Sequence, residues 1–127
     1  MILPDLIIAP SGKKGRGVFA GKTIEKNTVI EISPVIVLDK KDRNLIEKTK
    51  LNNYIFEWGD KRKKACIALG YVSLYNHSYS SNCEYEMDFE SKTIKITTVK
   101  KVMIGEELTI NYNAEPDNKT PIWFEVT

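Results

Sequence analysis

Strict alternation of acidic and apolar side chains over residues 83–90 is the feature that most constrains the fold of this chain. In the segment CEYEMDFE the acids stand at positions 84, 86, 88 and 90, with Tyr85, Met87 and Phe89 between them. A period of two residues is typical of a β-strand with one buried face. After a two-residue turn, residues 93–99 return with Ile94 and Ile96 on one face. The sequence therefore predicts a half-buried β-hairpin.

The rest of the chain also favours short strands. We expect further strands over residues 2–9, 18–20, 29–38 and 108–112, with Pro34 breaking or bulging the third of them. The only helical window, residues 39–53, is short and polar. The chain of 127 residues is close to the common length of one domain, and it contains no repeat or linker. The sequence predicts a single, mostly β domain over residues 1–127 with one or two short helices.

Several classes of protein are disfavoured by composition. The longest apolar runs, residues 6–9 and 35–38, are far shorter than the roughly 18 residues of a membrane span, so no membrane segment is expected. Two cysteines and a single histidine are too few for a structural zinc site, so no metal is expected. No secretory signal is apparent, and we expect reduced, at least half-buried thiols at Cys66 and Cys83 and a cytoplasmic or nuclear location.

The charge balance gives little support for a nucleic-acid binder. Nineteen basic residues face 17 acidic ones, for a formal net charge of +2. The basic clusters at residues 61–64 and 100–101 are expected to be solvated turns, and no direct nucleic-acid contact is expected. The acidic residues at 84–90 either guide a lysine-rich tail or form a solvated face.

Residues 14–20, with the sequence KGRGVFA, form a candidate ligand-binding loop. Two glycines one residue apart let the backbone approach a ligand closely or adopt positive φ. A tight turn between strands explains the same pattern. No third glycine opens a helix after a strand, so the segment is not a dinucleotide-binding fingerprint.

A polar segment, YNHS over residues 75–78, is followed by NC at residues 82–83. The lone histidine fits a polar knot that satisfies buried backbone groups. The alternative is nucleophilic catalysis, with His77 as the base and Cys83 or Ser78 as the nucleophile. Spacing alone offers no orienting partner for such a base.

Taken together, these segments resemble the SET domain of protein-lysine methyltransferases. The resemblance is carried by GRGVFA, by YIF with Tyr54, by YNHS before SNC, and by GEELTINY, which ends at Tyr112. It covers about residues 6–113, and the length is similar to that of the minimal, small viral histone-lysine methyltransferase, which has only the catalytic core. The resemblance implies a β-clip fold of small curved sheets. In this fold the Tyr112 strand and the Asn76-His77 segment form a pseudoknot.

The resemblance also implies the cofactor and the reaction. S-adenosyl-L-methionine would donate a methyl group to the ε-amine of a substrate lysine. Tyr112 matches the catalytic tyrosine, Tyr54 would line the channel wall, and Tyr85 stands where a Tyr or Phe limits the number of methyl groups. This tight pocket favours mono- or dimethylation. The residues implied to bind the cofactor are Lys14, Gly15, Arg16, Gly17, Tyr54, Asn76, His77, Tyr112 and Trp123.

The remaining expectations concern the tail and the partners. Residues 114–127 lack the cysteines of a post-SET zinc cluster, and Trp123-Phe124 is expected to cover the adenine instead. A histone or another basic protein bearing a lysine is the expected substrate. By the same resemblance, a homodimer could form through an exposed edge. The alternative function is a catalytically inactive SET-fold module that binds an extended peptide by strand addition.

Overall fold

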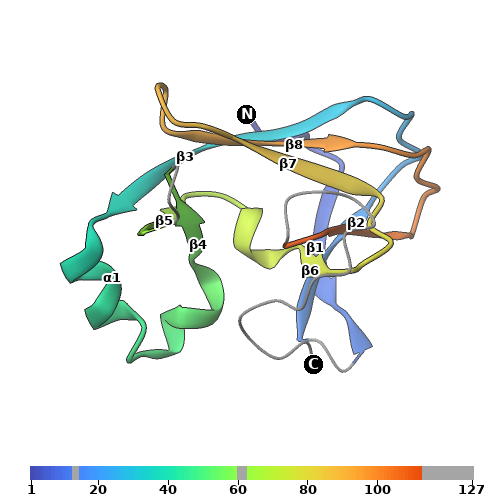
Figure 1. Cartoon of the computed structure of the whole chain (residues 1–127). Helices are drawn as coiled ribbons and strands as arrows, with labels where there is room; N and C mark the ends of the chain where they lie inside the picture. The colour runs from blue at the N-terminus through green and yellow to red at the C-terminus, as the bar shows by residue number, and fades with distance from the viewer. Residues whose placement is uncertain (13–14, 60–62, 113–127) are drawn as a thin grey trace.

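The computed structural model describes residues 1–12, 15–59 and 63–112. Short strands dominate it, as the sequence predicts (Figure 1). The single α-helix of the described residues is α1 (Lys40–Ile46), and short 3₁₀ turns cover Lys50–Tyr54 and Val72–Leu74. The strands are β1 (Leu6–Pro10), β2 (Arg16–Ala20), β3 (Val29–Leu38), β4 (Phe56–Trp58), β5 (Lys64–Ala68), β6 (Asn76–His77), β7 (Cys83–Asp88), β8 (Thr93–Thr98) and β9 (Glu107–Ile110).

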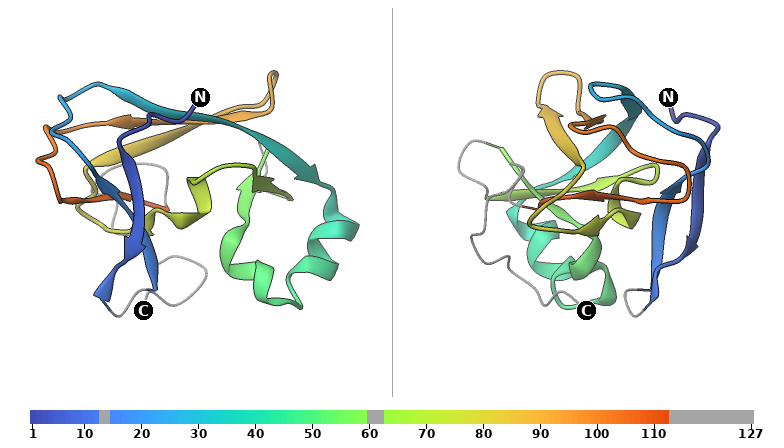
Figure 2. Two further views of the ribbon diagram at one scale, coloured as in Figure 1. Left: turned by 180° about the vertical axis from the view of Figure 1, so that it is seen from behind. Right: turned by 90° about the vertical axis from the view of Figure 1, so that its right-hand side faces the viewer.

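These strands form two small sheets. The first has the order β1-β2-β9-β6 and the second the order β4-β5-β3-β8-β7. All pairs are antiparallel except β6 with β9, which is parallel. Figure 2 shows the curvature of the sheets from two further directions. The mostly β fold with small curved sheets is therefore confirmed.

The alternating segment forms the predicted hairpin. β7 and β8 pair antiparallel with Tyr85 opposite Ile96 and Met87 opposite Ile94. Ile94 and Ile96 are fully buried, whereas Glu86 on the other face of β7 is exposed. The turn contains Lys92 at a φ of 55°, a conformation uncommon for a residue with a side chain.

The five-stranded sheet curls until its two edge strands meet. β4 and β7 stand at opposite ends of the strand order, yet the rings of Phe56 and Tyr85 lie 5.4 Å apart between centroids. The rings of Trp58 and Phe89 form a second, edge-to-face contact at 4.8 Å. Aromatic pairs at such separations add to the stabilisation from apolar burial. Aromatic side chains therefore close this sheet on itself.

Strand β3 departs from the prediction at Pro34. The strand is continuous over Val29–Leu38, and its register shift lies between Val29 and Glu31 instead. Pro34 stands where β3 changes partner from β8 to β5, and its carbonyl accepts the Leu69 N–H at 2.9 Å. The missing proline N–H therefore falls at the end of the β5 ladder, where it does not interrupt the strand.

The helix is shorter than the predicted window of residues 39–53. Its N-cap is Asp39, whose side chain accepts the Asp42 N–H at 2.8 Å. None of its residues is buried, and Leu45 is 56% exposed. Arg43 ties the helix to the sheet through the Lys64 carbonyl at 3.1 Å. Ile46 is its one apolar residue that packs against a buried cluster, that of Leu38, Ile55 and Ala65, and this small contact gives little support for a longer helix.

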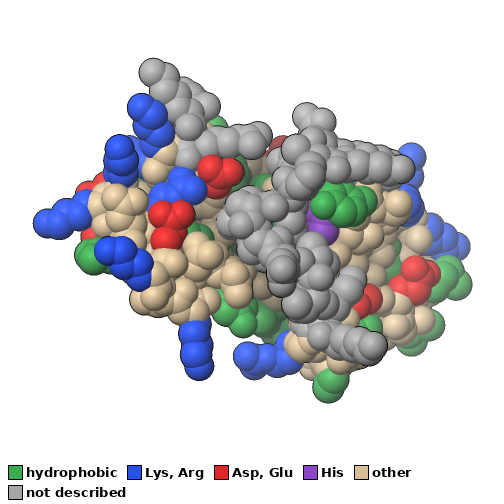
Figure 3. Space-filling model, turned by 60° about the horizontal axis from the view of Figure 1, so that its bottom comes forward, with side chains coloured by type: hydrophobic (Ala, Val, Ile, Leu, Met, Phe, Trp, Pro, Cys, Tyr) green, Lys and Arg blue, Asp and Glu red, His purple; other side chains and the backbone are tan. Residues whose placement is uncertain are grey.

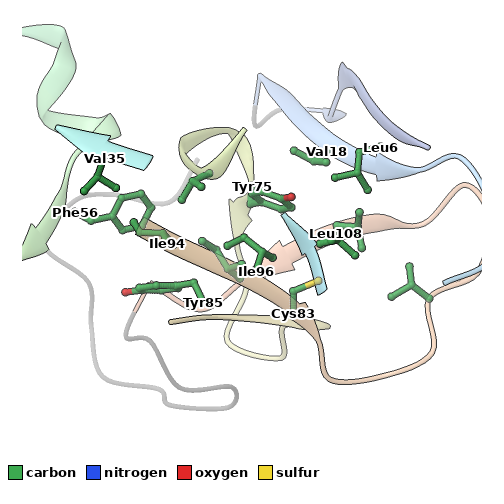
Figure 4. Packing of buried hydrophobic residues seen from close by; sticks show 14 of the residues in the cluster. Leu6, Val18, Val35, Phe56, Tyr75, Cys83, Tyr85, Ile94, Ile96 and Leu108 are labelled. Atoms are coloured by element: carbon green, nitrogen blue, oxygen red, sulfur yellow. The ribbon is translucent and has the colours of Figure 1, made fainter. Parts of the chain in front are cut away.

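A single main cluster of buried side chains joins the two sheets (Figure 4). Tyr75, Val18 and Leu108 contribute from the side of the first sheet, and Ile94 and Ile96 from the second. No helix in the described part of the chain is long and apolar enough to cross a membrane.

Both thiols lie in this core. Cys66 on β5 and Cys83 on β7 are free and fully buried, as the sequence predicts. Burial raises the pKa of each thiol from 9.0 to about 12, because the thiolate would lose its hydration. A Cys83 nucleophile is therefore wrong, since this thiol is protonated at neutral pH and inaccessible to a substrate.

We expect Ile96→Ala to lower the free energy of unfolding by about 2–5 kcal/mol, because it removes methyl groups from a fully buried site. Urea denaturation measures this change. The matched control is Lys95→Ala, whose side chain is 40% exposed and whose ion pair with Glu86 is at the surface. We expect a change within about 0.5 kcal/mol for this control. Equal losses in the two variants would contradict the assigned burial.

We also expect stability to fall as the pH rises above 9. Unfolding lets both thiols ionise from 9.0, whereas the folded state holds their pKa at about 12. The stabilisation is thus complete below pH 9 and is lost as the pH rises through the folded value. One unit above the unfolded pKa, the loss is about 1.4 kcal/mol per thiol. Urea denaturation across this range should give a shallower decline for the Cys66→Ala/Cys83→Ala variant, and identical slopes would reject this origin.

Candidate active site

The parallel pairing of β6 with β9 brings three distant parts of the chain together. Asn76 lies opposite Thr109 and His77 opposite Ile110, and the Ser78 N–H donates to the Ile110 carbonyl at 3.0 Å. On its other side β9 pairs with β2, with Val18 opposite Leu108. This is the adjacency that the predicted pseudoknot requires, and the threading itself remains a prediction. The GRGVFA and YNHS motifs, on β2 and β6, thus lie on either side of the GEELTINY motif on β9.

Asn76 is bonded to the glycine-containing segment. Its Nδ2 donates to Glu107 Oε2 at 2.6 Å and to the Arg16 carbonyl at 3.2 Å. Ser11 Oγ donates to Glu107 Oε1 at 2.6 Å, so the carboxylate of this β9 residue joins the segment after β1 to β6. A Cβ built on Gly17 would collide with Glu107 Oε2 and lie 2.9 Å from Asn76 Nδ2. A side chain at position 17 would therefore have to displace the Glu107 carboxylate and the Asn76 amide from their present positions.

Gly15 differs from Gly17. Its φ is +76°, and a Cβ there would meet no atom within 4 Å. Its carbonyl accepts the Ser11 N–H at 2.6 Å. The backbone conformation, not crowding, thus favours glycine at position 15. Of the predicted cofactor residues, Gly15, Arg16, Gly17 and Asn76 lie in one region.

Tyr112 is held at both its backbone and its hydroxyl. The hydroxyl donates to the Tyr75 carbonyl at 2.8 Å, and the Tyr112 N–H donates to His77 Nδ1 at 3.0 Å. The Tyr85 hydroxyl in turn donates to the Tyr112 carbonyl at 2.9 Å. His77 is buried and receives a backbone N–H, which is the polar knot expected as the first alternative. Its ring positions Tyr112, while its backbone belongs to β6.

Aromatic rings surround the Tyr112 side chain. Phe56 meets it edge to face at a centroid distance of 5.9 Å and also contacts Tyr85. Burial raises the pKa of Tyr112 from 10.0 to about 12, with smaller contributions from the negative charge of Glu107 and from Tyr54. Tyr54 itself is 46% exposed, and its carbonyl accepts from Ser73 Oγ at 2.6 Å. At neutral pH the Tyr112 phenol is therefore neutral.

A buried carboxylate fixes the segment before β6. Glu31 is fully buried and accepts hydrogen bonds from the Tyr75 hydroxyl at 2.8 Å, the Tyr71 N–H at 2.8 Å and Ser33 Oγ at 2.6 Å. The pKa of Tyr75 is raised, first by burial and then by the neighbouring Glu31 charge. Since Tyr75 supplies the carbonyl that receives the Tyr112 hydroxyl, Glu31 indirectly positions Tyr112.

Some sequence predictions fall elsewhere. Lys14 and Trp123 lie outside the described residues. Glu84, Glu86 and Asp88 alternate with Tyr85 along β7, so they point away from the Phe56 and Tyr112 rings. The acidic stripe thus lies on the opposite face of the sheet from the candidate site. Within the described residues, no group of three or more His, Cys, Asp or Glu side chains could hold a metal ion.

Sequence reasoning missed the residues that act through hydrogen bonds. Glu107 was part of a motif without a role of its own, and Glu31 and Phe56 received none. Asn82 extends β9: its Oδ1 accepts the Thr109 N–H at 2.9 Å, and its Nδ2 donates to the Glu107 carbonyl at 2.9 Å. The sequence placed Asn82 in the SNC motif, but nothing in the motif indicated that its side chain binds β9.

Known proteins are similar to this chain over nearly its whole length. The SET domain family model matches residues 15–113. A Schizosaccharomyces pombe histone-lysine N-methyltransferase, H3 lysine-37 specific, is 33% identical over 98% of this chain and 80% of its own length. An H3 lysine-36 specific enzyme of Cryptococcus neoformans and the human histone-lysine N-methyltransferase 2D are 31% and 30% identical. The chain spans only 13% and 2% of those two proteins.

Solved structures agree. A Plasmodium falciparum chain assigned as a histone methyltransferase superposes with a TM-score of 0.65 at 28% identity, covering 87% of this chain and 95% of the other. A chain of an apo PRC2 structure with mutations in Ezh2 gives a TM-score of 0.70 at 19% identity, over 84% of this chain and 15% of that chain, which shows the fold alone. From its sequence match, its relatives and its fold, this chain belongs to the SET domain family.

Proposed function

We propose that this protein is a protein-lysine N-methyltransferase that uses S-adenosyl-L-methionine. The observation that carries the proposal is the fixed position of the Tyr112 hydroxyl, which donates a hydrogen bond to the Tyr75 carbonyl. This phenol stands in an aromatic enclosure and follows the strand that also contacts Asn76 and the segment of Gly17. The names of the relatives, all histone-lysine N-methyltransferases, support the same activity.

The residues at the β2–β9–β6 junction fit the proposed cofactor. Arg16 brings its backbone carbonyl beside the Asn76 amide, and the Glu107 carboxylate adds negative charge. A carboxylate beside the site favours a ligand with a positive sulfonium and an ammonium group. When bound, S-adenosyl-L-methionine supplies an electrophilic methyl group. The assignments of Lys14 and Trp123 to cofactor binding rest on the family resemblance.

The chain's own residues would orient the substrate amine. Methyl transfer to an amine needs in-line placement of the reacting atoms and a neutral nitrogen. The Tyr112 hydroxyl donates its hydrogen bond to the Tyr75 carbonyl, so the lone pairs of the hydroxyl oxygen are available as acceptors. With its pKa raised to about 12, Tyr112 acts as an orienting hydrogen-bond acceptor and not as a phenolate base. Phe56 and Tyr85 form an apolar wall, which favours the neutral form of a lysine by excluding water.

The proposed substrate is a lysine in a protein, for which a histone or another basic protein is the first candidate. A homodimer and a cytoplasmic or nuclear location remain predictions. An inactive peptide-binding module would have no need to keep the glycine-containing segment, the Asn76-His77 pair and Tyr112 together, and the presence of all three favours an enzyme. On the face shown in Figure 3, the described Lys and Arg side chains are interspersed with acidic ones at both ends of the molecule.

We expect wild-type protein to bind S-adenosyl-L-methionine in a calorimetric titration and to transfer labelled methyl groups to lysine-containing peptides. Tyr112→Phe should retain binding but lower kcat by about a hundredfold, because it removes only the orienting oxygen. Asn76→Ala should lose binding, since Asn76 connects the glycine segment to β9. Thermal unfolding of each variant separates lost binding from lost folding. Absence of binding by the folded wild type, with peptide present, would reject the enzyme in favour of the peptide-binding module.

We expect Tyr85→Phe to shift the product towards higher methylation. The substitution removes a hydroxyl that now donates to the Tyr112 carbonyl at 2.9 Å and so leaves more space beside the proposed lysine channel. Mass spectrometry of the methylated peptide measures the ratio of mono-, di- and trimethyl products. Tyr79→Phe is the matched control, because Tyr79 contacts His77 and has no ring contact with Phe56 in the described structure. An unchanged product ratio would reject Tyr85 as the limit on methyl number.

A further inference from the structure

A hollow lies beside the aromatic rings of Trp58 and Phe89, on the same strand, β4, that contributes Phe56 to the candidate active site. It measures about 490 Å³ and is lined by Val37, Trp58, Gly59, Lys63, Lys64, Phe89 and Lys92. Its floor is the edge-to-face pair of Trp58 and Phe89. The tip of the β7–β8 hairpin lies at the end of the molecule that carries β4 and β5 (Figures 1 and 2). None of the described residues that contact Tyr112 lines this hollow, so the proposed function gives it no role.

The hollow lies close to the proposed lysine channel along β4, because one of its lining residues, Trp58, follows Phe56 by two residues. Phe56 contacts the Tyr112 ring, and Trp58 lies two residues further along β4 with the same buried orientation. At about 3.3 Å per residue this step is about 7 Å. Phe89 extends the row by another 4.8 Å between ring centroids. An extended peptide whose lysine reaches Tyr112 would therefore place a residue two to four positions away over the hollow.

Three lysines line the hollow. Lys63, Lys64 and Lys92 are exposed, and Lys64 lies directly opposite Trp58 in the β4–β5 pair. In the described part of the chain, no ion pair involves any of these three lysines. The acidic side chains of β7 lie on the other face of the strand from Tyr85 and do not line the hollow. Apolar rings below and ammonium groups around them suit a side chain with a short aliphatic stem and a carboxylate.

We propose that this hollow is a substrate-specificity subsite that binds a glutamate or aspartate side chain two to four residues from the methylated lysine. The inference rests on the proposed function and refines it. The preferred substrates are then proteins whose target lysine has an acidic neighbour, and a uniformly basic tail is a poorer ligand. Opposite charges across an interface chiefly set which partner binds and how fast it associates, so the expected effect is on selection among peptides.

The test uses three fluorescein-labelled peptide libraries with a central lysine. They differ only in carrying glutamate, glutamine or lysine at the positions two to four residues from it. Binding is measured by fluorescence polarisation with S-adenosyl-L-methionine present, and methyl transfer by mass spectrometry. We expect the glutamate library to bind about tenfold more tightly than the glutamine library at low salt, and the lysine library to bind most weakly.

Matched variants locate the effect. Lys63→Glu/Lys64→Glu should abolish the preference for glutamate, whereas Lys63→Arg/Lys64→Arg should retain it. Lys26→Glu/Lys100→Glu makes the same change in net charge at exposed turns outside the hollow and should leave the preference unchanged. Neither pair touches Tyr112 or Asn76. A preference that survives Lys63→Glu/Lys64→Glu, or that is lost equally in the control pair, would overturn the assignment.

The two readouts separate this inference from the proposed function. Methyl transfer without a glutamate preference overturns the subsite and leaves the enzyme intact. A glutamate preference that depends on Lys63 and Lys64, without methyl transfer to any library, supports the hollow as a binding site and rejects the methyltransferase. Failure of every library to bind the folded protein overturns both.

Discussion

The parallel pairing of the two-residue strand β6 with β9 is the constraint on which the candidate site depends. Two residue pairs make a weak ladder by themselves, so side chains complete it: Asn82 receives the Thr109 N–H beyond one end, and His77 receives the Tyr112 N–H at the other. Asn76 and Glu107 then join this pair to β2 through the Arg16 carbonyl. The same bonds that satisfy backbone groups of the fold therefore set the position of Tyr112, and substitutions at these residues act on folding and on the site together.

Buried Glu31 connects the second sheet to this junction. A carboxylate without access to water is costly unless its oxygens are hydrogen-bonded, and here three donors from Ser33, Tyr71 and Tyr75 fill this need. Because the donors come from both β3 and the segment before β6, the network fixes the distance between the two sheets. The buried Tyr75 ring occupies the space between them, and its carbonyl ends the chain of contacts at the Tyr112 hydroxyl.

The sequence predicted the parts of this molecule that depend on local periodicity. The hairpin of residues 83–90 and 93–99 was predictable because alternation directly encodes a two-faced strand, and the motifs of Asn76 and Tyr112 were predictable from the family resemblance. Glu31 was not, because alternation between Ile30 and Ile32 suggests a solvated acid. The register shift between Val29 and Glu31 instead buries both Ile30 and Glu31, and only the distant Tyr71 and Tyr75 make that burial tolerable. The prediction that Pro34 breaks or bulges its strand was wrong for a related reason. The effect of a proline depends on whether a neighbouring strand needs its N–H, and the partner of β3 changes at this residue.

Closure of the second sheet by aromatic side chains decides how charge is distributed around the site. Since Tyr85 must face Phe56 to close the sheet, the pleat of β7 sends Glu84 and Glu86 to the opposite face. The strand that contributes Tyr85 therefore cannot also present its acids to a substrate at Tyr112. Charge on the site's own face comes from other elements: Glu107 of β9 acts on Tyr112, and Lys63, Lys64 and Lys92 line the hollow beside Trp58 and Phe89. The alternation of β7 thus explains why the acidic stripe is remote from the site. It also explains why the lysines at the hollow can select among substrate peptides without competition from these acids.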